Sequence, residues 1–150
     1  MPSMDAILAS VTTVLLVDWP SPDVPDTLVR AGYTVHYKGG PAADDFFVGE
    51  WHEGQAVQQR TGEPPAHADL VYAHRPHREL TDLAALAKQV GAAVLWWQSG
   101  VGNDATPDPR GCWVPREESD HARGIAQAAG LRYVDDVYIA DAVRRFNNDR

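Results

Sequence analysis

Cysteine, positive charge and long apolar runs are all scarce in this chain of 150 residues. The single cysteine, Cys112, excludes an internal disulfide and fits a reducing compartment. No base that would activate it is visible in the sequence, so we expect a packed or loop thiol rather than a nucleophile. No run reaches the roughly eighteen apolar residues that a membrane helix needs, and no basic start precedes the first apolar stretch, as a signal peptide would require. We therefore expect a cytoplasmic protein with no membrane partner.

Acidic residues outnumber basic ones, with 21 Asp and Glu against 13 Lys and Arg and a formal net charge of -8. Such a surface repels phosphate backbones, and no local cluster of Lys and Arg offsets it. We therefore expect no nucleic-acid partner. A small anionic ligand stays compatible with this charge, because a single pocket can be positive on an acidic protein.

Along the sequence, apolar runs typical of buried strands alternate with segments whose apolar residues have helical spacing. Length and composition, with 44% hydrophobic and 23% charged residues, predict one domain over residues 1–150. Strands are predicted at about 12–17, 33–37, 69–73, 92–97 and 132–134, and helices at about 4–10, 22–31, 79–90, 120–129 and 139–146. Strands that alternate with helices need right-handed crossovers. The predicted fold is α/β, a Rossmann-like, doubly wound, mostly parallel five-stranded sheet with helices on both faces.

Two segments fit this alternation poorly. In residues 42–68, Phe46, Phe47 and Trp51 indicate a packed excursion, with short strand pieces as one interpretation. Residues 106–118 form a proline-rich stretch around Trp113, which we interpret either as a lid over a site or as a homodimer contact.

The loops after the predicted strands hold the candidate site, because ligands of open parallel sheets bind at the carboxyl ends of the strands. Positive charge or hydrogen-bond donors come from Lys38, His74 and Arg75, and glycines after two strands permit close approach of a ligand to the backbone. Together these loops predict an anion-binding rim. The alternative is that turn glycines and basic residues at strand ends are ordinary features of any α/β domain.

The same loops carry a family resemblance. The fourth strand and its loop follow the pattern Trp-x-Gln-x-Gly-x-x-Asn, and the third strand runs into an Arg-Pro turn. These motifs, with a Gly-Tyr-x-Val passage into the second strand, resemble the small CoA-binding domain proteins, and they are found at Trp96, Gln98, Gly100, Asn103, Arg75, Pro76, Gly32, Tyr33 and Val35. The likeness covers most of the chain outside about 42–68 and 106–118.

The resemblance implies a bound CoA or acyl-CoA, or a related adenine nucleotide. Lys38-Gly39-Gly40 is similar to the Lys-Gly-Gly that holds CoA phosphates in succinyl-CoA ligase alpha chains. Those ligases carry their phosphorylated histidine in a further domain, so the resemblance implies binding without ligase chemistry. The predicted ligand-binding residues are Ser21, Lys38, Gly39, Gly40, His74, Arg75, Gln98, Gly100 and Asn103.

The first loop departs from the family, in which it is glycine-rich and lies against phosphate at a helix N-terminus. Residues 18–23 contain no glycine, two prolines that lack backbone donors, and two aspartates. A carboxylate beside a phosphate costs on the order of 1 kcal/mol or more. Trp19 in this loop either stacks on a ligand ring or covers the sheet edge. Two hypotheses follow: a CoA-type ligand bound by the remaining loops, or an interaction protein with a degenerate nucleotide site that acts as a homo-oligomer or a partner subunit.

Two other kinds of site are disfavoured. A nicotinamide enzyme would need Gly-x-Gly-x-x-Gly after Val17 and an acid near Lys38, and neither is present. His74 and His77 are spaced as metal ligands on one helical turn, but Pro76 separates them and no further ligand follows at a suitable spacing.

Overall fold

A computed structural model describes residues 3–148 of the chain. It contains one seven-stranded sheet in the order β4-β3-β2-β1-β5-β6-β7. Five strands run parallel: β1 (Thr13–Val17), β2 (Thr34–Lys38), β5 (Leu70–Ala73), β6 (Val94–Trp97) and β7 (Arg132–Val134). The other two, β3 (Phe46–His52) and β4 (Gln55–Arg60), form an antiparallel hairpin beside β2.

The prediction of a five-stranded sheet was therefore wrong, although the parallel part and the α/β class are confirmed. The two further strands lie in the segment 42–68. Their residues gave little alternation because the hairpin is exposed at its far end, where Trp51 is 40% exposed. The turn of the hairpin uses Glu53 and Gly54, both with positive φ. The sheet pairing itself begins at Phe46, which lies opposite Lys38.

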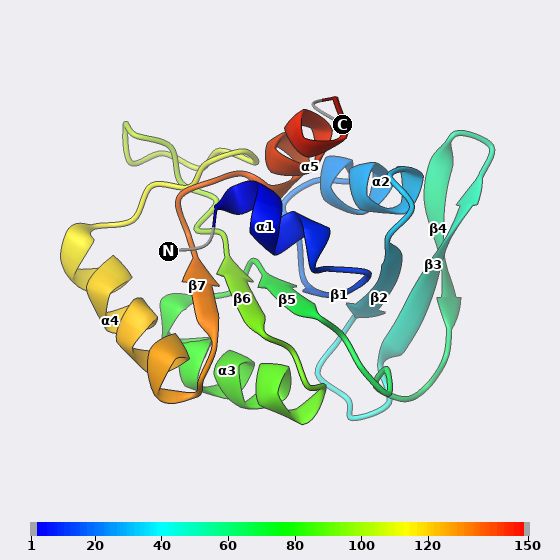
Figure 1. Cartoon of the computed structure of the whole chain (residues 1–150), viewed down its shortest axis with the longest axis horizontal. Helices are drawn as coiled ribbons and strands as arrows, with labels where there is room; N and C mark the ends of the chain where they lie inside the picture. Colours follow the sequence, from blue (N-terminus) through cyan, green and yellow to red (C-terminus); the bar gives the residue numbers. More distant parts are fainter. Residues whose placement is uncertain (1–2, 149–150) are drawn as a thin grey trace.

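Helices cover both faces of the sheet (Figure 1). On one face lie α1 (Met4–Ala9), α2 (Asp23–Arg30) and α5 (Ile139–Asn148), and on the other the 3-10 turn η1 (His77–Glu79), α3 (Leu80–Gln89) and α4 (Arg116–Ala128). In the described part of the chain, no helix combines the length and the apolar character that crossing a bilayer requires.

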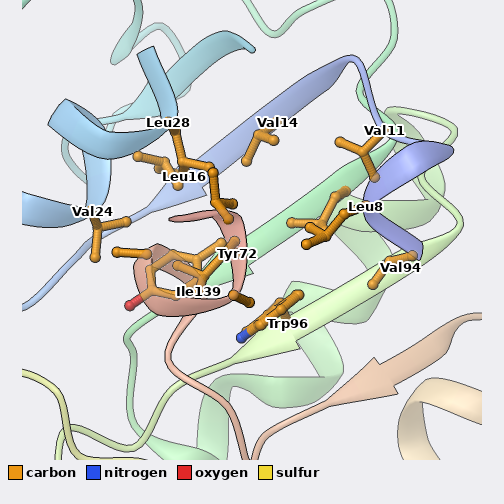
Figure 2. Close-up of a cluster of buried hydrophobic side chains, with 14 of the residues drawn as sticks. Leu8, Val11, Val14, Leu16, Val24, Leu28, Tyr72, Val94, Trp96 and Ile139 are labelled. Carbon is orange, nitrogen blue, oxygen red and sulfur yellow. The ribbon is translucent and has the colours of Figure 1, made fainter. Parts of the chain in front are cut away.

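The central strand β1 contributes to two hydrophobic cores because successive side chains point to opposite faces. Val14 and Leu16 pack in the cluster under α1, α2 and α5, which Figure 2 shows, whereas Leu15 packs toward α3 and α4. Leu15 and Leu16 are both fully buried. Burial of each such side chain stabilises the fold by about 1.5–3 kcal/mol. The run Val14-Leu15-Leu16-Val17 is apolar without alternation, which predicts a central strand buried on both faces, and the structure confirms it.

One predicted helix start was wrong, and one predicted cap. The sequence Ser21-Pro22 predicts a serine N-cap, but helix α2 begins at Asp23, one residue after the predicted start, with Pro22 as its N-cap residue and no side-chain cap. Helix α4 begins at Arg116, about four residues before the predicted start, and the preceding loop ends at Pro115. Pro115 sets this start, because a proline lacks an N–H and fits only at the edge of a helix.

The order of the parallel strands places the switch point between β1 and β5. The chain leaves β1 for β2 on one side and returns to β5 on the other. The loops after these two strands therefore diverge and leave a crevice at the carboxyl ends, which is where such sheets bind ligands.

Candidate functional site

Two hollows flank this switch point. The first, here called the Lys38 hollow, has a volume of about 710 Å³ and is lined by Val17, Asp18, Trp19, Lys38, Gly39, Gly40, Pro41, Phe47, Gln58, Arg75 and Glu79. The second, the Trp113 hollow, has a volume of about 600 Å³ and is lined by Asp18, His74, Arg75, Pro76, His77, Trp97, Ser99, Val101, Trp113, Val114, Pro115 and Glu118.

Lys38 is the free cation of the first hollow. It is the last residue of β2, and its Nζ donates to the backbone oxygens of Gly40 at 2.6 Å and Ala42 at 3.4 Å. It also lies 5.4 Å from the centre of the Phe46 ring. Within residues 3–148 its ammonium forms no ion pair with a carboxylate. Carbonyl oxygens leave its full positive charge uncompensated, so the position suits an anionic group of a ligand.

Gly39 and Gly40 line the same hollow, but close packing against the hairpin segment already explains why they are glycines. A Cβ on Gly39 would lie 2.8 Å from the Phe47 ring, and one on Gly40 would lie 2.6 Å from an Asp45 carboxylate oxygen. Gly39 N–H also donates to the Asp45 carbonyl at 2.9 Å. A larger residue at position 39 would have to displace the Phe47 ring, which lines the hollow, whereas one at position 40 would displace the Asp45 carboxylate.

Trp19 forms an aromatic wall of the Lys38 hollow. Its ring packs edge-on against Tyr37, with centroids 5.1 Å apart. Burial, followed by the charge of Asp26, raises the pKa of the Tyr37 hydroxyl to about 12. Tyr37 is therefore neutral and serves as packing, whereas Trp19 lines the hollow together with Phe47.

Arg75 is engaged by two carboxylates. Its Nε and Nη2 donate to Glu79 at 3.1 and 2.8 Å, and its Nη1 donates to Asp18 at 3.3 Å. The Glu79 hydrogen bonds raise the pKa of Arg75, and Arg75 in turn holds the pKa of Glu79 below its usual value. Asp18 has a φ of 62°, a left-handed conformation that Asp tolerates better than most residues. The sequence predicted that the acidic first loop would oppose phosphate binding. In the structure, Asp18 of this loop forms an ion pair with Arg75, the cation that was expected to bind phosphate.

His74 and Gly100 lie against each other beyond the carboxyl ends of β5 and β6. The His74 Nδ1 is 3.2 Å from the Gln98 carbonyl oxygen. A Cβ on Gly100 would collide with the His74 ring, and Gly100 has a φ of 70°. This glycine is therefore required by the turn and by the histidine, and its role in close approach to a ligand stays a prediction.

Gln98 is placed inside the protein and not in either hollow. It is fully buried, its Oε1 accepts from the Tyr72 hydroxyl, and its Nε2 donates to the carbonyls of Pro109 at 2.9 Å and Gly111 at 3.2 Å. In this arrangement the amide braces the loop that follows β6. Asn103 lies exposed in the turn of that same loop.

Ser21 lies at a third hollow of about 570 Å³, beside Tyr138 and Arg110. The start of α2 is occupied there by Asp23, which accepts from Tyr138 at 2.7 Å and Arg144 at 2.9 Å. An anion at this helix end would meet a carboxylate that is already satisfied.

The Trp113 hollow combines two tryptophans with polar groups. Trp97 is 4% exposed and points to the face opposite Trp96, as the strand alternation predicted, and it lines this hollow. His77 packs edge-on against Trp97 at 5.8 Å and lies 5.4 Å from the His121 ring. Among the residues that the structure describes, no three His, Cys, Asp or Glu side chains group as metal ligands.

Cys112 is half-buried in the loop after β6. Burial, followed by the charges of Asp136 and Asp135, raises the pKa of its thiol to about 12. The thiol is thus protonated at neutral pH, as expected of a packed residue rather than a nucleophile.

Phe47, Gln58 and Glu79 belong to the Lys38 hollow and were missed by sequence reasoning. Phe47 was recognised in the sequence only as a packing residue of the segment 42–68, and Gln58 carried no signal that pointed to the site. Glu79 had one, since it lies four residues after Arg75, but that spacing indicates a pair only where the chain turns helically, as η1 does.

Comparisons with known proteins bear on this geometry. Residues 16–140 match a family described as a CoA binding domain. A search of curated proteins found no match to the sequence.

Solved structures share the fold. The chain is 20% identical to Prb, a protein redesigned for binding, with a TM-score of 0.61 over 98% of this chain and 92% of that one. A protein from Thermus thermophilus is 20% identical, with a TM-score of 0.58 over 94% of each chain. A hypothetical protein from Pyrococcus horikoshii is 18% identical, with a TM-score of 0.57 over 96% of this chain and 89% of that one.

Proposed function

The chain belongs to the CoA binding domain family, and we propose that it is a small-molecule binding protein for CoA, an acyl-CoA or a related adenine nucleotide. The ligand lies across the carboxyl ends of β2, β1 and β5. The observation that carries the proposal is the Lys38 hollow, which joins an unpaired ammonium, the Trp19 ring and the Arg75 guanidinium at the switch point of the sheet.

In this proposal Lys38 binds a phosphate group and Trp19 contacts the base. An ammonium held by carbonyl oxygens has no carboxylate to lose when a phosphate arrives, so the new ion pair adds directly to affinity. A tryptophan face at the edge of a hollow offers a stacking surface to any purine, and such stacking is worth about 1–3 kcal/mol.

Arg75 is the second residue that binds phosphate, and the phosphate must displace the Asp18 carboxylate from it. The side chains of Arg75 and Asp18 are 39% and 51% exposed. An ion pair this exposed contributes only about 0–1 kcal/mol. A phosphate with two charges competes well against it, whereas Glu79 holds the guanidinium through two hydrogen bonds and keeps it oriented.

Isothermal titration tests the proposal, with CoA, acetyl-CoA, ATP and NAD added separately at low salt. We expect CoA and its thioester to bind. The double variant Lys38→Ala/Arg75→Ala should lose binding while its circular dichroism stays native, because neither side chain is part of the core.

The matched control is Lys88→Ala. Lys88 is the other lysine of the chain and lies exposed near the end of α3, close to the amino ends of the strands. Its removal takes away one positive charge, against two in the double variant, at a position outside both hollows, so affinity should stay as in the wild type. Equal affinity of the double variant and the wild type would contradict the assignment of Lys38 and Arg75.

Arg75 is already ion-paired with Asp18 and Glu79, and this pairing favours a second candidate, an interaction protein with a degenerate site. This candidate predicts no heat from any nucleotide and a stable homo-oligomer or partner complex. Light scattering on the same samples separates the two, since a monomer that binds CoA would rule the second candidate out.

A further inference from the structure

The Trp113 hollow adjoins the Lys38 hollow. Asp18 and Arg75 line both, and the ion pair between these two side chains separates them. A long ligand whose phosphate replaces Asp18 on Arg75 can extend from the Lys38 hollow into the Trp113 hollow. The residues that line the Trp113 hollow indicate which chemical group of the ligand it would accept.

One wall of the Trp113 hollow is apolar and aromatic, whereas Asp18, Arg75 and Glu118 add charge at its rim. Trp97 forms a buried wall, Trp113 stands 42% exposed at the surface, and Val101 and Val114 also line it. A site of this kind gains affinity from apolar groups and gains little from a hydrated thiol, because affinity rises with the apolar area removed from water.

The hollow is held in shape before any ligand arrives. Trp97 Nε1 donates to the Arg75 carbonyl at 2.8 Å, and Trp113 N–H donates to the Val101 carbonyl at 2.9 Å. Gly100 N–H donates to the Gly111 carbonyl at 3.0 Å, so the loop after β6 is closed on itself. A preformed wall lowers the ordering cost of binding.

We propose that the Trp113 hollow binds the acyl group of an acyl-CoA thioester, and that Trp113 makes this chain prefer longer acyl groups over free CoA. The inference rests on the proposed function, because the nucleotide end is assigned to the Lys38 hollow. Each methylene that enters the hollow should tighten binding by roughly fourfold until the hollow is filled.

The test is a titration series with CoA, acetyl-CoA, butanoyl-CoA and hexanoyl-CoA. In the wild type we expect hexanoyl-CoA to bind at least tenfold more tightly than acetyl-CoA. Trp113→Ala should reduce this ratio to near one while affinity for free CoA stays within about twofold, and Trp113→Phe should retain most of the ratio, since its ring preserves an apolar wall. Equal affinities across the series in the wild type, or an unchanged ratio in Trp113→Ala, would overturn the inference.

Trp51→Ala is the matched control, because Trp51 is 40% exposed, close to the 42% of Trp113, and lies in β3 outside both hollows. This variant should leave the ratio of hexanoyl-CoA affinity to acetyl-CoA affinity unchanged. A loss of the ratio in Trp51→Ala would show a general effect of removing surface tryptophan and would also overturn the inference.

A ligand without a nucleotide separates this inference from the proposed function. S-hexanoyl-N-acetylcysteamine carries the thioester and acyl chain alone, and its binding is measured by ligand-observed NMR on the wild type and Trp113→Ala. If CoA fails to bind but this thioester binds in a Trp113-dependent way, the proposed nucleotide site is contradicted and the acyl site is supported. If CoA binds without chain-length dependence and the thioester does not bind, only the acyl site is contradicted. If neither ligand binds, both proposals are contradicted.

Discussion

Asp18 is the residue that the two hollows of the candidate site share with Arg75. It stands directly after β1, accepts from the Trp19 N–H at 2.9 Å and from Arg75 at 3.3 Å, and faces both hollows. A carboxylate here repels any phosphate that approaches Arg75. One side chain therefore controls how much of the anion-binding potential of the switch point is available.

Asp18→Asn should increase affinity for CoA by roughly fivefold, because removal of a charge a few Å from a phosphate relieves on the order of 1 kcal/mol. Asparagine tolerates the same left-handed backbone and keeps an oxygen for the Trp19 N–H. Isothermal titration at low salt measures the change.

The control is Asp120→Asn, which alters the net charge equally at an exposed position on α4. It should leave affinity unchanged. Weaker or equal CoA binding by Asp18→Asn would mean that Asp18 does not face the bound phosphate.

Among the structural elements, the loop from β6 to α4 illustrates how a segment without regular structure can still be rigid. Its two ends are joined by Gly100 and Gly111, it forms a bridge between Val101 and Pro107, and Gln98 braces it from below. The sequence interpretation of a lid or a homodimer contact is not tested by these contacts. They do show that the loop carries Trp113 on a fixed frame.

Gly111→Ala should destabilise the protein by about 1–3 kcal/mol, because the new Cβ would lie 2.7 Å from the Val101 backbone nitrogen and would also collide with its carbonyl group. Backbone atoms cannot move aside as a flexible side chain can. The free energy of unfolding in urea measures the loss.

Gly124→Ala provides the opposite expectation on the neighbouring element. Gly124 lies exposed within α4, and a Cβ there would have no neighbour within 4 Å in the described structure. Alanine is the better helix former, so this variant should be up to about 1 kcal/mol more stable. A stability gain in Gly111→Ala, or a large loss in Gly124→Ala, would contradict the packing described here.

On the scale of the whole molecule, carboxylates with lowered pKa values tie distant segments together. Burial would raise the pKa of Asp23, but hydrogen bonds from Arg144 and Tyr138 hold it below the usual 3.8. Burial would also raise the pKa of Asp141, but hydrogen bonds from Arg144 and Arg110 hold it below 3.8 as well. These contacts connect α2, α5 and the loop after β6.

The free energy of unfolding should therefore fall at acid pH. A carboxylate whose pKa is lower in the folded state stabilises the fold above its unfolded pKa, and that contribution is lost as pH falls below about 4 through the folded pKa. Urea titrations between pH 7 and pH 2.5 measure this. Asp23→Asn should be less stable than the wild type at pH 7 and should lose less stability below pH 4; parallel curves for the two proteins would contradict the role of Asp23.

The sequence by itself determined the α/β class and the five parallel strands. Hydrophobic period is a local property, so β1 and the helices could be located from their own residues. The pattern Trp96-x-Gln98-x-Gly100 also identified the family, because it stands within one contiguous segment.

Only the tertiary structure decided how the predicted site residues are used. Whether Gln98 faces a ligand or the interior depends on Tyr72 and on the loop carbonyls, and whether Arg75 is free depends on Asp18, which is 57 residues away in the chain. The hairpin β3–β4 likewise exists because β2 offers it an edge to pair with. Contacts of this kind are made between segments that are distant in sequence, and no local pattern records them.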